Sequence, residues 1–385
     1  MKKKTGLNKV IVIPDSFKGT MSSVEICEII SCSILEKYPA CQVISIPVAD
    51  GGEGTVECLS RIADVKKEIV EVTGPAFNKV TAEYAVSGDT AIMELAEAAG
   101  LTLADEGARN PMKTTTFGVG EMIRDAVFKG YRNIILGIGG SATNDCGAGA
   151  AAALGTVFTD HEGNSLIPTG ENLIKVRKID NSKTEELLRD CSIRIICDVD
   201  NPLYGEKGAA HVFAPQKGAD AEMVELLNKG LEAFAKTMES QLGIDMADVP
   251  GAGAAGGMGA GSVAFLGGVL NRGIDIILDM VGFEEKLEHC DLVITGEGSL
   301  DSQSLRGKVI SGVADRARKQ NVSVIAVVGQ VDASMEEIEG MGVNAVFTTN
   351  QKAQPLSESA PYCKGNLKMT IDNIMNIFRI TDSEK

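Results

Sequence analysis

The chain lacks tryptophan, has three histidines, and is poor in other aromatic residues, which make up 4% of its 385 positions. No apolar run approaches the roughly 20 residues that a membrane-spanning helix requires. Basic residues are outnumbered by acidic ones, 37 against 53, and no basic stripe with interleaved aromatics appears. The sequence therefore predicts neither a membrane segment nor a nucleic-acid partner.

The cysteines form no pattern typical of a metal site or a disulfide framework. There are nine, an odd number, and none belongs to a C-x-x-C motif. With isolated histidines, this makes a zinc site unexpected and predicts reduced thiols. The basic start Met1–Lys4 precedes an apolar run that is too short for a signal peptide. We therefore expect a cytoplasmic protein.

What the chain does contain is an alternation of short apolar runs and helical patterns. Strands are predicted at residues 10–14, 42–48, 133–136, 193–197, 292–295, 322–328 and 345–348, and helices at 23–37, 116–128, 221–239, 308–319 and 367–378. This order is typical of an α/β fold with parallel strands, and the length predicts two domains. Residues 66–73, 80–86 and 91–95 interrupt it with three strand-like runs and no helix. Such an interruption indicates a mixed or antiparallel element that belongs to an inserted domain.

Acidic residues follow five of the apolar runs, in glycine-rich loops. The loops carry Asp15, Asp50 with Glu53, Asp145, Asp198 with Asp200, and Glu297 with Asp301. Ligands of open α/β sheets bind outside the carboxyl ends of strands, so five such loops suggest a shared site, although some of these acids can simply cap helices. Carboxylates suit Mg²⁺, and the N–H groups of glycine-rich loops suit phosphate oxygens. Together they indicate phosphoryl transfer.

The first of these loops, Asp15-Ser16-Phe17-Lys18-Gly19-Thr20, allows two interpretations. It is a polar turn before a helix capped by Ser22 or Ser23, or it is a ligand loop at the end of a strand.

The familiar phosphate motifs are incomplete or ambiguous. A Walker A loop fails at Gly307-Lys308, because Ser302 and Val309 stand where the motif needs glycine and a hydroxyl. The run from Gly137 to Ala142 fits a dinucleotide fingerprint, but polar residues interrupt the expected helix start. The glycine-rich segment 251–262 is open to three interpretations, namely a closely packed helix start, a phosphate cradle and a hinge.

Six of these motifs, taken in order, resemble the bacterial glycerate kinases of the first class. They are D-S-F-K-G (15–19), A-D-G-G-E-G-T (49–55), G-G-S-A-T-N-D (139–145), C-D-V-D-N-P-L (197–203), G-A-G-A-A-G-G-M-G (251–259) and T-G-E-G-S-L-D-S-Q-S-L-R-G-K (295–308). One departure is Cys146, where the family commonly has a second glycine.

The resemblance implies a kinase that uses ATP and Mg²⁺ to phosphorylate D-glycerate, usually to 2-phosphoglycerate. It also implies two α/β domains with the active site in the cleft between them. One is flavodoxin- or Rossmann-like, with a parallel sheet built from both chain ends (residues 1–68 and 287–385), and the other is inserted (69–286). Transfer to the 3-hydroxyl and a related small hydroxy acid stay open as alternatives. A non-catalytic metabolite-binding protein and an NAD-linked oxidoreductase are more remote, and a homo-oligomer is left open.

Within this resemblance we assign roles to individual residues. Asp198 is expected to be the catalytic base, with Asp50 as the alternative, and Lys18 to bind a phosphate or the substrate carboxylate. The other expected substrate- and phosphate-binding residues are Asp15, Ser16, Gly19, Arg306 and Lys308. The expected nucleotide-binding residues are Gly139, Gly140, Ser141, Thr143 and Asn144, and the expected Mg²⁺ ligands are Asp50 and Asp301.

Overall fold

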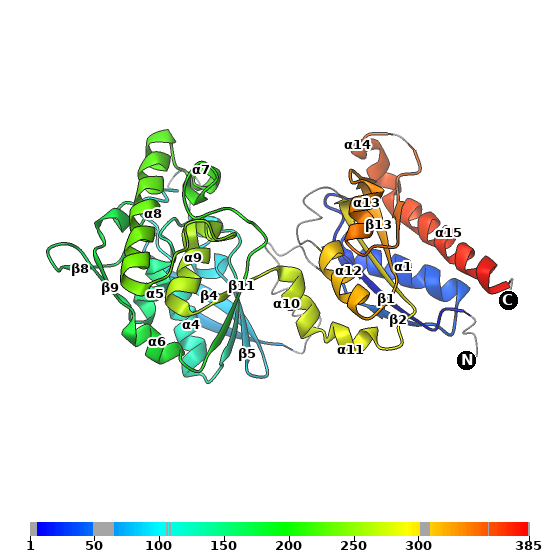
Figure 1. Cartoon of the computed structure of the whole chain (residues 1–385), viewed down its shortest axis with the longest axis horizontal. Helices are drawn as coiled ribbons and strands as arrows, with labels where there is room; N and C mark the ends of the chain where they lie inside the picture. Colours follow the sequence, from blue (N-terminus) through cyan, green and yellow to red (C-terminus); the bar gives the residue numbers. More distant parts are fainter. Residues whose placement is uncertain are drawn as a thin grey trace. The chain divides into compact units, whose positions relative to one another are not determined.

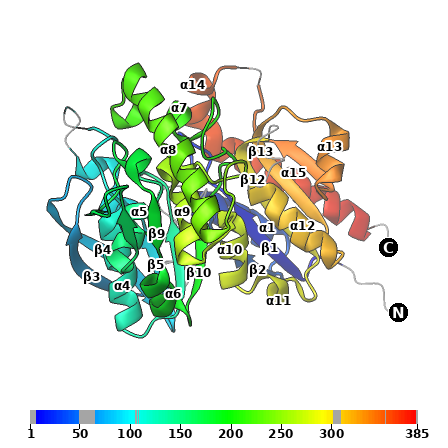
Figure 2. The same cartoon turned by 60° about the vertical axis from the view of Figure 1, so that its left-hand side comes forward.

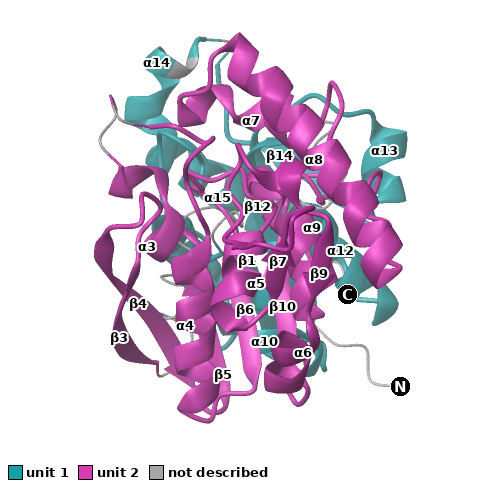
Figure 3. Ribbon diagram, turned by 90° about the vertical axis from the view of Figure 1, so that its left-hand side faces the viewer, with its two compact units in different colours: residues 1–50, 272–385 teal, residues 51–271 magenta. Residues whose placement is uncertain are grey.

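The computed structural model describes residues 6–48, 65–104, 107, 109–300, 309–352 and 354–383. The chain divides into two units, which Figure 3 shows in different colours. Unit 1 joins both chain ends, Met1–Asp50 and Arg272–Lys385, and unit 2 is the continuous segment Gly51–Asn271. Within the described residues, no helix combines the length and the apolar content needed to cross a membrane.

Unit 1 is built on a parallel five-stranded sheet in the order β14-β13-β12-β1-β2. Figure 1 labels β1, β2 and β13 of this sheet. Its strands are β1 (Lys9–Pro14), β2 (Gln42–Ser45), β12 (Leu292–Leu300), β13 (Val324–Val331) and β14 (Ala345–Thr348). Numbered along unit 1 alone, this is the 2-1-3-4-5 order of flavodoxin-like folds. The predicted α/β class and the parallel sheet from both chain ends are therefore confirmed.

Helices cover both faces of this sheet, and for that reason its central strands are continuous apolar runs. Val10 and Val12 of β1 pack on the side of α1 (Ser23–Lys37) and α15 (Cys363–Ser383), which lie side by side in Figure 1. Ile11 and Ile13 are equally buried and point to the opposite face, where α12 contacts β1, β12 and β13. The remaining helices of unit 1 are α10 (Gly273–Met280), α11 (Phe283–Leu287), α12 (Val309–Lys319), α13 (Met335–Gly340), α14 (Leu356–Ser359) and the 3-10 turn η6 (Ala360–Tyr362).

Unit 2 contains a mixed six-stranded sheet in the order β11-β10-β6-β5-β4-β3. Figure 2 labels β3, β4, β5 and β10 of this sheet. Its strands are β3 (Lys66–Thr73), β4 (Lys79–Ser87), β5 (Thr90–Glu94), β6 (Asn133–Gly137), β10 (Ser192–Ile196) and β11 (Val269–Asn271). Strand β4 is antiparallel to β3 and β5, whereas β5, β6, β10 and β11 are parallel. The predicted mixed element after residue 66 is confirmed.

Helices and a second, three-stranded antiparallel sheet complete unit 2. The helices are α3 (Ala96–Ala99), α4 (Phe117–Phe128), α5 (Ala148–Leu154), α6 (Ser182–Leu188), α7 (Ala209–Phe213), α8 (Ala221–Leu242) and α9 (Ala254–Leu266), with 3-10 turns η1 (Leu101–Leu103), η3 (Leu173–Lys175) and η4 (Pro215–Lys217). The small sheet contains β7 (Val157–Thr159), β8 (Ser165–Leu166) and β9 (Lys178–Asp180). Phe158, Phe234 and Phe265 join β7, α8 and α9, with ring centroids 5.5–6.0 Å apart.

The boundaries of the two units differ from those predicted at residues 68/69 and 286/287. Strand β3 pairs with β4 along its whole length, so it belongs entirely to unit 2. Helices α10 and α11 belong to unit 1, because Arg316 of α12 forms ion pairs with Asp275, Asp279 and Glu284. No composition change marks either boundary in the sequence.

Candidate functional site

A pocket of about 490 Å³ lies at the carboxyl edge of the sheet in unit 1. Its walls come from the loops after β1 and β14 and from the last residues of β12 and β13. The end of α14, the first residue of η6 and the start of α15 complete them. The position between β1 and β12 is the topological switch point of the sheet, where flavodoxin-like folds bind their ligands. The strand order thus places the first predicted ligand loop at a ligand-binding position of the fold.

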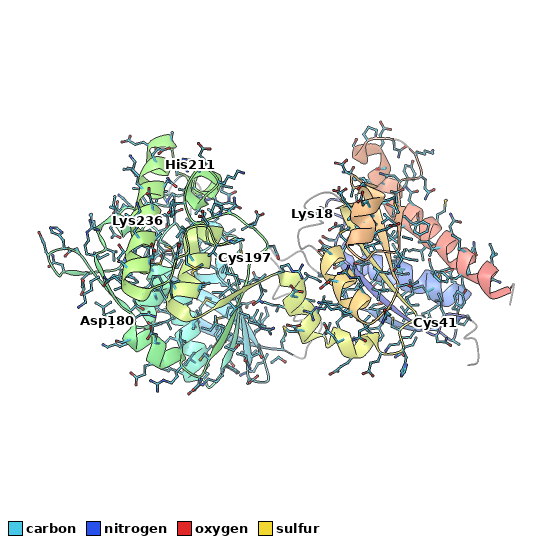
Figure 4. The ribbon with its side chains drawn as sticks, viewed as in Figure 1. Lys18, Cys41, Asp180, Cys197, His211 and Lys236 are labelled. Carbon is cyan, nitrogen blue, oxygen red and sulfur yellow. The ribbon has the colours of Figure 1, made fainter. Side chains whose placement is uncertain are left out.

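The loop after β1 is held by its backbone and by one buried aromatic side chain. Phe17 is 4% exposed and packs in the core of unit 1, and its N–H donates to Met21 O (2.9 Å). Gly19 takes φ +79°, a left-handed conformation that closes the turn. The exposed Lys18, shown in Figure 4, therefore lies on the pocket wall together with Asp15 and Ser16.

The predicted helix cap is confirmed at Ser22, and the ligand-loop interpretation stays a prediction for the residues before it. Ser22 caps α1, since its Oγ accepts from Glu25 N–H (3.3 Å) and the Glu25 carboxylate accepts from Ser22 N–H (2.9 Å). Asp15, Ser16 and Lys18 instead line the pocket. Gly19 is not among its described lining residues.

Two carboxylates at neighbouring strand ends bring oxygen ligands into the pocket. Asp15 and Glu297 are 5% and 4% exposed, and Asp15 N–H donates to Gly296 O (2.8 Å), next to Glu297. Ser16 and Ser299 add hydroxyls to the same lining. This all-oxygen donor set fits a hard cation such as Mg²⁺, which often takes one or two carboxylates and completes its shell with water and substrate phosphates. Among the described residues there is no ready-made cluster of three or more metal-ligating side chains.

Four predicted site residues cannot be placed. Asp50, Asp301, Arg306 and Lys308 lie outside the described residues. Their roles stay predictions, as does the predicted cleft between domains.

A second group of candidate residues lies at the carboxyl edge of the sheet in unit 2. The loop 138–145 follows β6, and Cys197 and Asp198 follow its neighbour β10. Asp198 is exposed, in keeping with access to a substrate. Gly253 N–H donates to Asn201 O (3.0 Å) and Cys146 N–H donates to Gly256 O (3.1 Å). The segments around Asp145, Asp198 and residue 255 are therefore brought together.

The predicted nucleotide loop is mostly buried. Gly139 and Gly140 are partly exposed, whereas Ser141 is 5% exposed and Thr143 and Asn144 are 0% exposed. Ala142 N–H donates to Ala99 O (2.8 Å), which fixes the middle of the loop. A ligand can thus reach the glycines of this loop more readily than its hydroxyls.

Lys217 is the residue of this region that the sequence did not reveal. It is 2% exposed, and its Nζ donates to Ser141 Oγ and to Thr143 O, both at 2.7 Å. Burial lowers the pKa of Lys217 to about 7, and the nearby Asp145 carboxylate opposes this shift. The only local signal was a lysine among small residues in A-P-Q-K-G-A, which matches no motif considered above.

Asp145 has a structural task in this fold. Its fully buried carboxylate accepts from Thr116 N–H (2.7 Å) and Thr116 Oγ1 (2.8 Å), and from the N–H groups of Gly147 and Gly149 (3.3 Å each). Burial raises the pKa of Asp145, and these hydrogen bonds oppose the rise. The carboxylate therefore occupies the N-termini of both α4 and α5, where a dinucleotide fold would bind pyrophosphate. This arrangement does not favour the dinucleotide interpretation of residues 137–142.

The glycine-rich segment 251–262 serves close packing. A Cβ at Gly253 would lie 2.2 Å from Pro202 O, one at Gly256 2.0 Å from Thr143 O, and one at Gly261 2.1 Å from Cys146 O. Ala255, Gly256 and Gly257 have positive φ, so the chain turns sharply before the regular part of α9. Of the three interpretations, close packing at a helix start is the one that the structure supports.

The fold and these strand-end loops define a two-unit α/β protein with a pocket at a flavodoxin-like switch point. The Glycerate kinase family model matches residues 10–379. The chain belongs to this family, is an enzyme of this type, and the predicted resemblance is confirmed.

Individual relatives cover nearly the whole chain. A glycerate 2-kinase of Escherichia coli K12 is 44% identical over 91% of this chain and 93% of its own length. A glycerate kinase of Bacillus cereus is 42% identical over 98% and 99%. A crystal structure from Salmonella typhimurium LT2, described as that of a candidate glycerate kinase 2, superposes with a TM-score of 0.82 at 41% identity and covers 98% of this chain and 100% of its own.

Proposed function

We propose that the protein phosphorylates D-glycerate with ATP and releases 2-phosphoglycerate and ADP. The observation that carries this proposal is the pocket at the switch point of unit 1, lined by Lys18 and two carboxylates, in a chain of the glycerate kinase family. A cation, carboxylates and glycine-rich loops are the parts from which phosphoryl-transfer sites are usually built. The name of the Escherichia coli relative supports the 2-hydroxyl as the acceptor.

In the proposed step, the 2-hydroxyl oxygen of glycerate attacks the terminal phosphorus of ATP, and the bond from that phosphorus to the ADP oxygen breaks. Asp198 accepts the hydroxyl proton, and its exposure at the end of β10 suits this role. Lys18 offsets negative charge on the phosphates or on the glycerate carboxylate. Ser16 donates a hydrogen bond to the same anion.

Mg²⁺ bound to ATP would neutralise charge on the transferring phosphoryl group. Asp15 and Glu297 are the described residues suited to hold it, and Asp50 and Asp301 stay as proposed ligands from the sequence. The loop with Gly139, Gly140, Ser141, Thr143 and Asn144 keeps its proposed role at the nucleotide phosphates, through its backbone N–H groups.

The test is ATP turnover with D-glycerate and Mg²⁺, coupled to enolase without a phosphoglycerate mutase. Enolase converts 2-phosphoglycerate, so the expected result is phosphoenolpyruvate formed in step with ADP. ADP formed without phosphoenolpyruvate would move the transfer to the 3-hydroxyl. No ADP with D-glycerate would contradict the proposal, and related hydroxy acids would then be assayed.

The role of Asp198 is tested by Asp198→Asn, which keeps the size of the side chain and removes its basicity. We expect kcat to fall by about 10²–10⁴, the usual contribution of a positioned base. The matched control is Asp200→Asn, an exposed acid two residues further along the same loop, for which kcat should change little. Equal turnover of Asp198→Asn and the unmodified enzyme would remove the assignment.

A further inference from the structure

The pocket of unit 1 is much larger than glycerate. Pockets of roughly 300–1,000 Å³ are those that bury drug-sized ligands, and about 490 Å³ lies in that range. A three-carbon acid would leave most of this volume to water. An adenosine moiety has the matching size, so the volume favours the nucleoside part of the nucleotide.

The lining of this pocket changes in character with distance from β1. At the β1 end it carries the charged and acidic groups Lys18, Asp15 and Glu297. Toward β13, β14 and α15 it carries neutral side chains instead. These comprise four amides and two small or apolar residues, namely Gln330, Asn350, Gln354, Asn366, Pro355 and Ala360. A neutral, amide-rich end suits a nucleobase, because the faces of its ring are apolar and the groups at its edge form hydrogen bonds.

Asn350 indicates which edge of a base this end can recognise. Its Nδ2 donates to Gly329 O at 3.0 Å, and because a carbonyl oxygen can only accept, this contact fixes the orientation of the amide. The Oδ1 atom is therefore the acceptor that Asn350 offers a ligand. An acceptor complements the exocyclic amino group of adenine and repels the carbonyl that guanine has at the same position.

In unit 2, Asp145 occupies the N-termini of α4 and α5, so these two helix ends do not offer their N–H groups to a dinucleotide. The pocket of unit 1, in contrast, lies at the switch point of its sheet.

We propose that the neutral end of the unit 1 pocket, around Asn350, Ala360 and Asn366, binds the adenine nucleoside of the nucleotide substrate. This proposal rests on the proposed kinase function for one point only, namely that the ligand is an adenine nucleotide. It concerns the adenine and the ribose, not the phosphates. Selection of adenine over guanine is assigned to the acceptor of Asn350.

The experiment is calorimetric titration of the full-length protein with ADP, which needs no turnover and so is independent of the kinase assay. The variant Ala360→Phe fills the pocket from the short turn before α15. The control is Gly365→Phe on α15, where an added Cβ meets nothing within 4 Å and the residue is exposed. We expect Ala360→Phe to raise the Kd of ADP at least about tenfold, and Gly365→Phe to leave it unchanged.

Two further measurements keep the proposal falsifiable. The variant Asn350→Leu should reduce the preference for ADP over GDP about tenfold while circular dichroism stays that of the unmodified protein. An Ala360→Phe protein that binds ADP normally overturns the proposal. If Ala360→Phe raises the KM for D-glycerate and leaves the KM for ATP unchanged, the pocket binds glycerate instead of the nucleoside. If the unmodified protein binds ADP in this pocket but does not phosphorylate D-glycerate, the kinase proposal fails and the nucleoside site stands.

Discussion

The carboxyl edges of the two sheets are made from similar residues and are used differently. Both carry glycine, acidic and hydroxyl residues after parallel strands. In unit 1 these loops leave a pocket of about 490 Å³ with Lys18 and Asn350 exposed around it. In unit 2 the loops pack on one another so closely that Thr143, Asn144 and Lys217 are buried. Composition at a strand end therefore does not by itself distinguish a ligand pocket from a packed interior.

The largest expected difference between the two edges comes from adding one methyl group to each. At Gly256 an added Cβ would lie 2.0 Å from Thr143 O, at a φ of +69°, whereas at Gly298 its nearest neighbour is 3.7 Å away. Gly256→Ala should lower the free energy of unfolding by more than about 3 kcal/mol, and Gly298→Ala should change it by less than about 0.5 kcal/mol. Urea unfolding followed by circular dichroism measures both. Similar losses for the two variants would show that the edges are packed alike.

The buried Lys217 of unit 2 predicts that the free energy of unfolding depends on pH. The exposed Lys18 at the edge of the unit 1 sheet carries no such prediction. The pKa of Lys217 is about 7 in the folded protein against an ordinary value of 10.5, so the unfolded chain binds more protons between these values. The free energy of unfolding should therefore rise with pH through this range, by up to about 1.4 kcal/mol per pH unit from this residue.

Comparison with Lys217→Met isolates this contribution, because all other groups titrate in both proteins. We expect the difference in unfolding free energy between the two proteins to grow with pH from about 7 to about 10. A difference that stays constant over this range would mean that Lys217 keeps an ordinary pKa. The variant also loses the hydrogen bonds to Ser141 and Thr143, which lowers its stability at every pH.

The smallest expected effect is on the stability of unit 1 when a pocket side chain is shortened. Asn350 is exposed, so Asn350→Ala should change the free energy of unfolding by less than about 0.5 kcal/mol. The same urea measurement tests this expectation. A loss of several kcal/mol would show that the amide supports the fold, and the contrast with unit 2 would be weaker than we infer.

Most of the fold could be predicted where local pattern and tertiary structure agree. Helix α1 begins and ends at the predicted residues, because the Ser22 cap and the apolar spacing determine it locally, and β3 was also predicted correctly. Strand β12 was predicted at residues 292–295. It runs to Leu300, five residues beyond the predicted end. In this extension Gly296, Glu297, Ser299 and Leu300 pair with β13, a tertiary effect that an apolar run does not reveal.

Two of the elements that were missed, α9 and β11, have sequences that look like loops. Helix α9 is rich in glycine and alanine and depends on backbone contacts with Thr143 and Cys146, which are distant in the sequence. Strand β11 has three residues. Asp15, Ser16 and Lys18 could be predicted to lie together at a strand end, because they follow a clear strand, and the structure places them on the wall of one pocket. The burial of Lys217 could not be predicted, because its hydrogen bond to Ser141 forms only where η4 contacts the loop after β6.

The discontinuous sheet of unit 1 affects how the protein is made. Strand β1 pairs with β12, and Thr295 Oγ1 donates to Ile13 O across 282 residues of sequence. On the ribosome, unit 2 can therefore fold as a continuous segment while β1 and α1 still wait for their partners. During that time the apolar runs of β1 and the inner face of α1 are without the strands and the C-terminal helix that cover them. We expect the nascent chain to need protection, for example by a chaperone, until synthesis reaches α15.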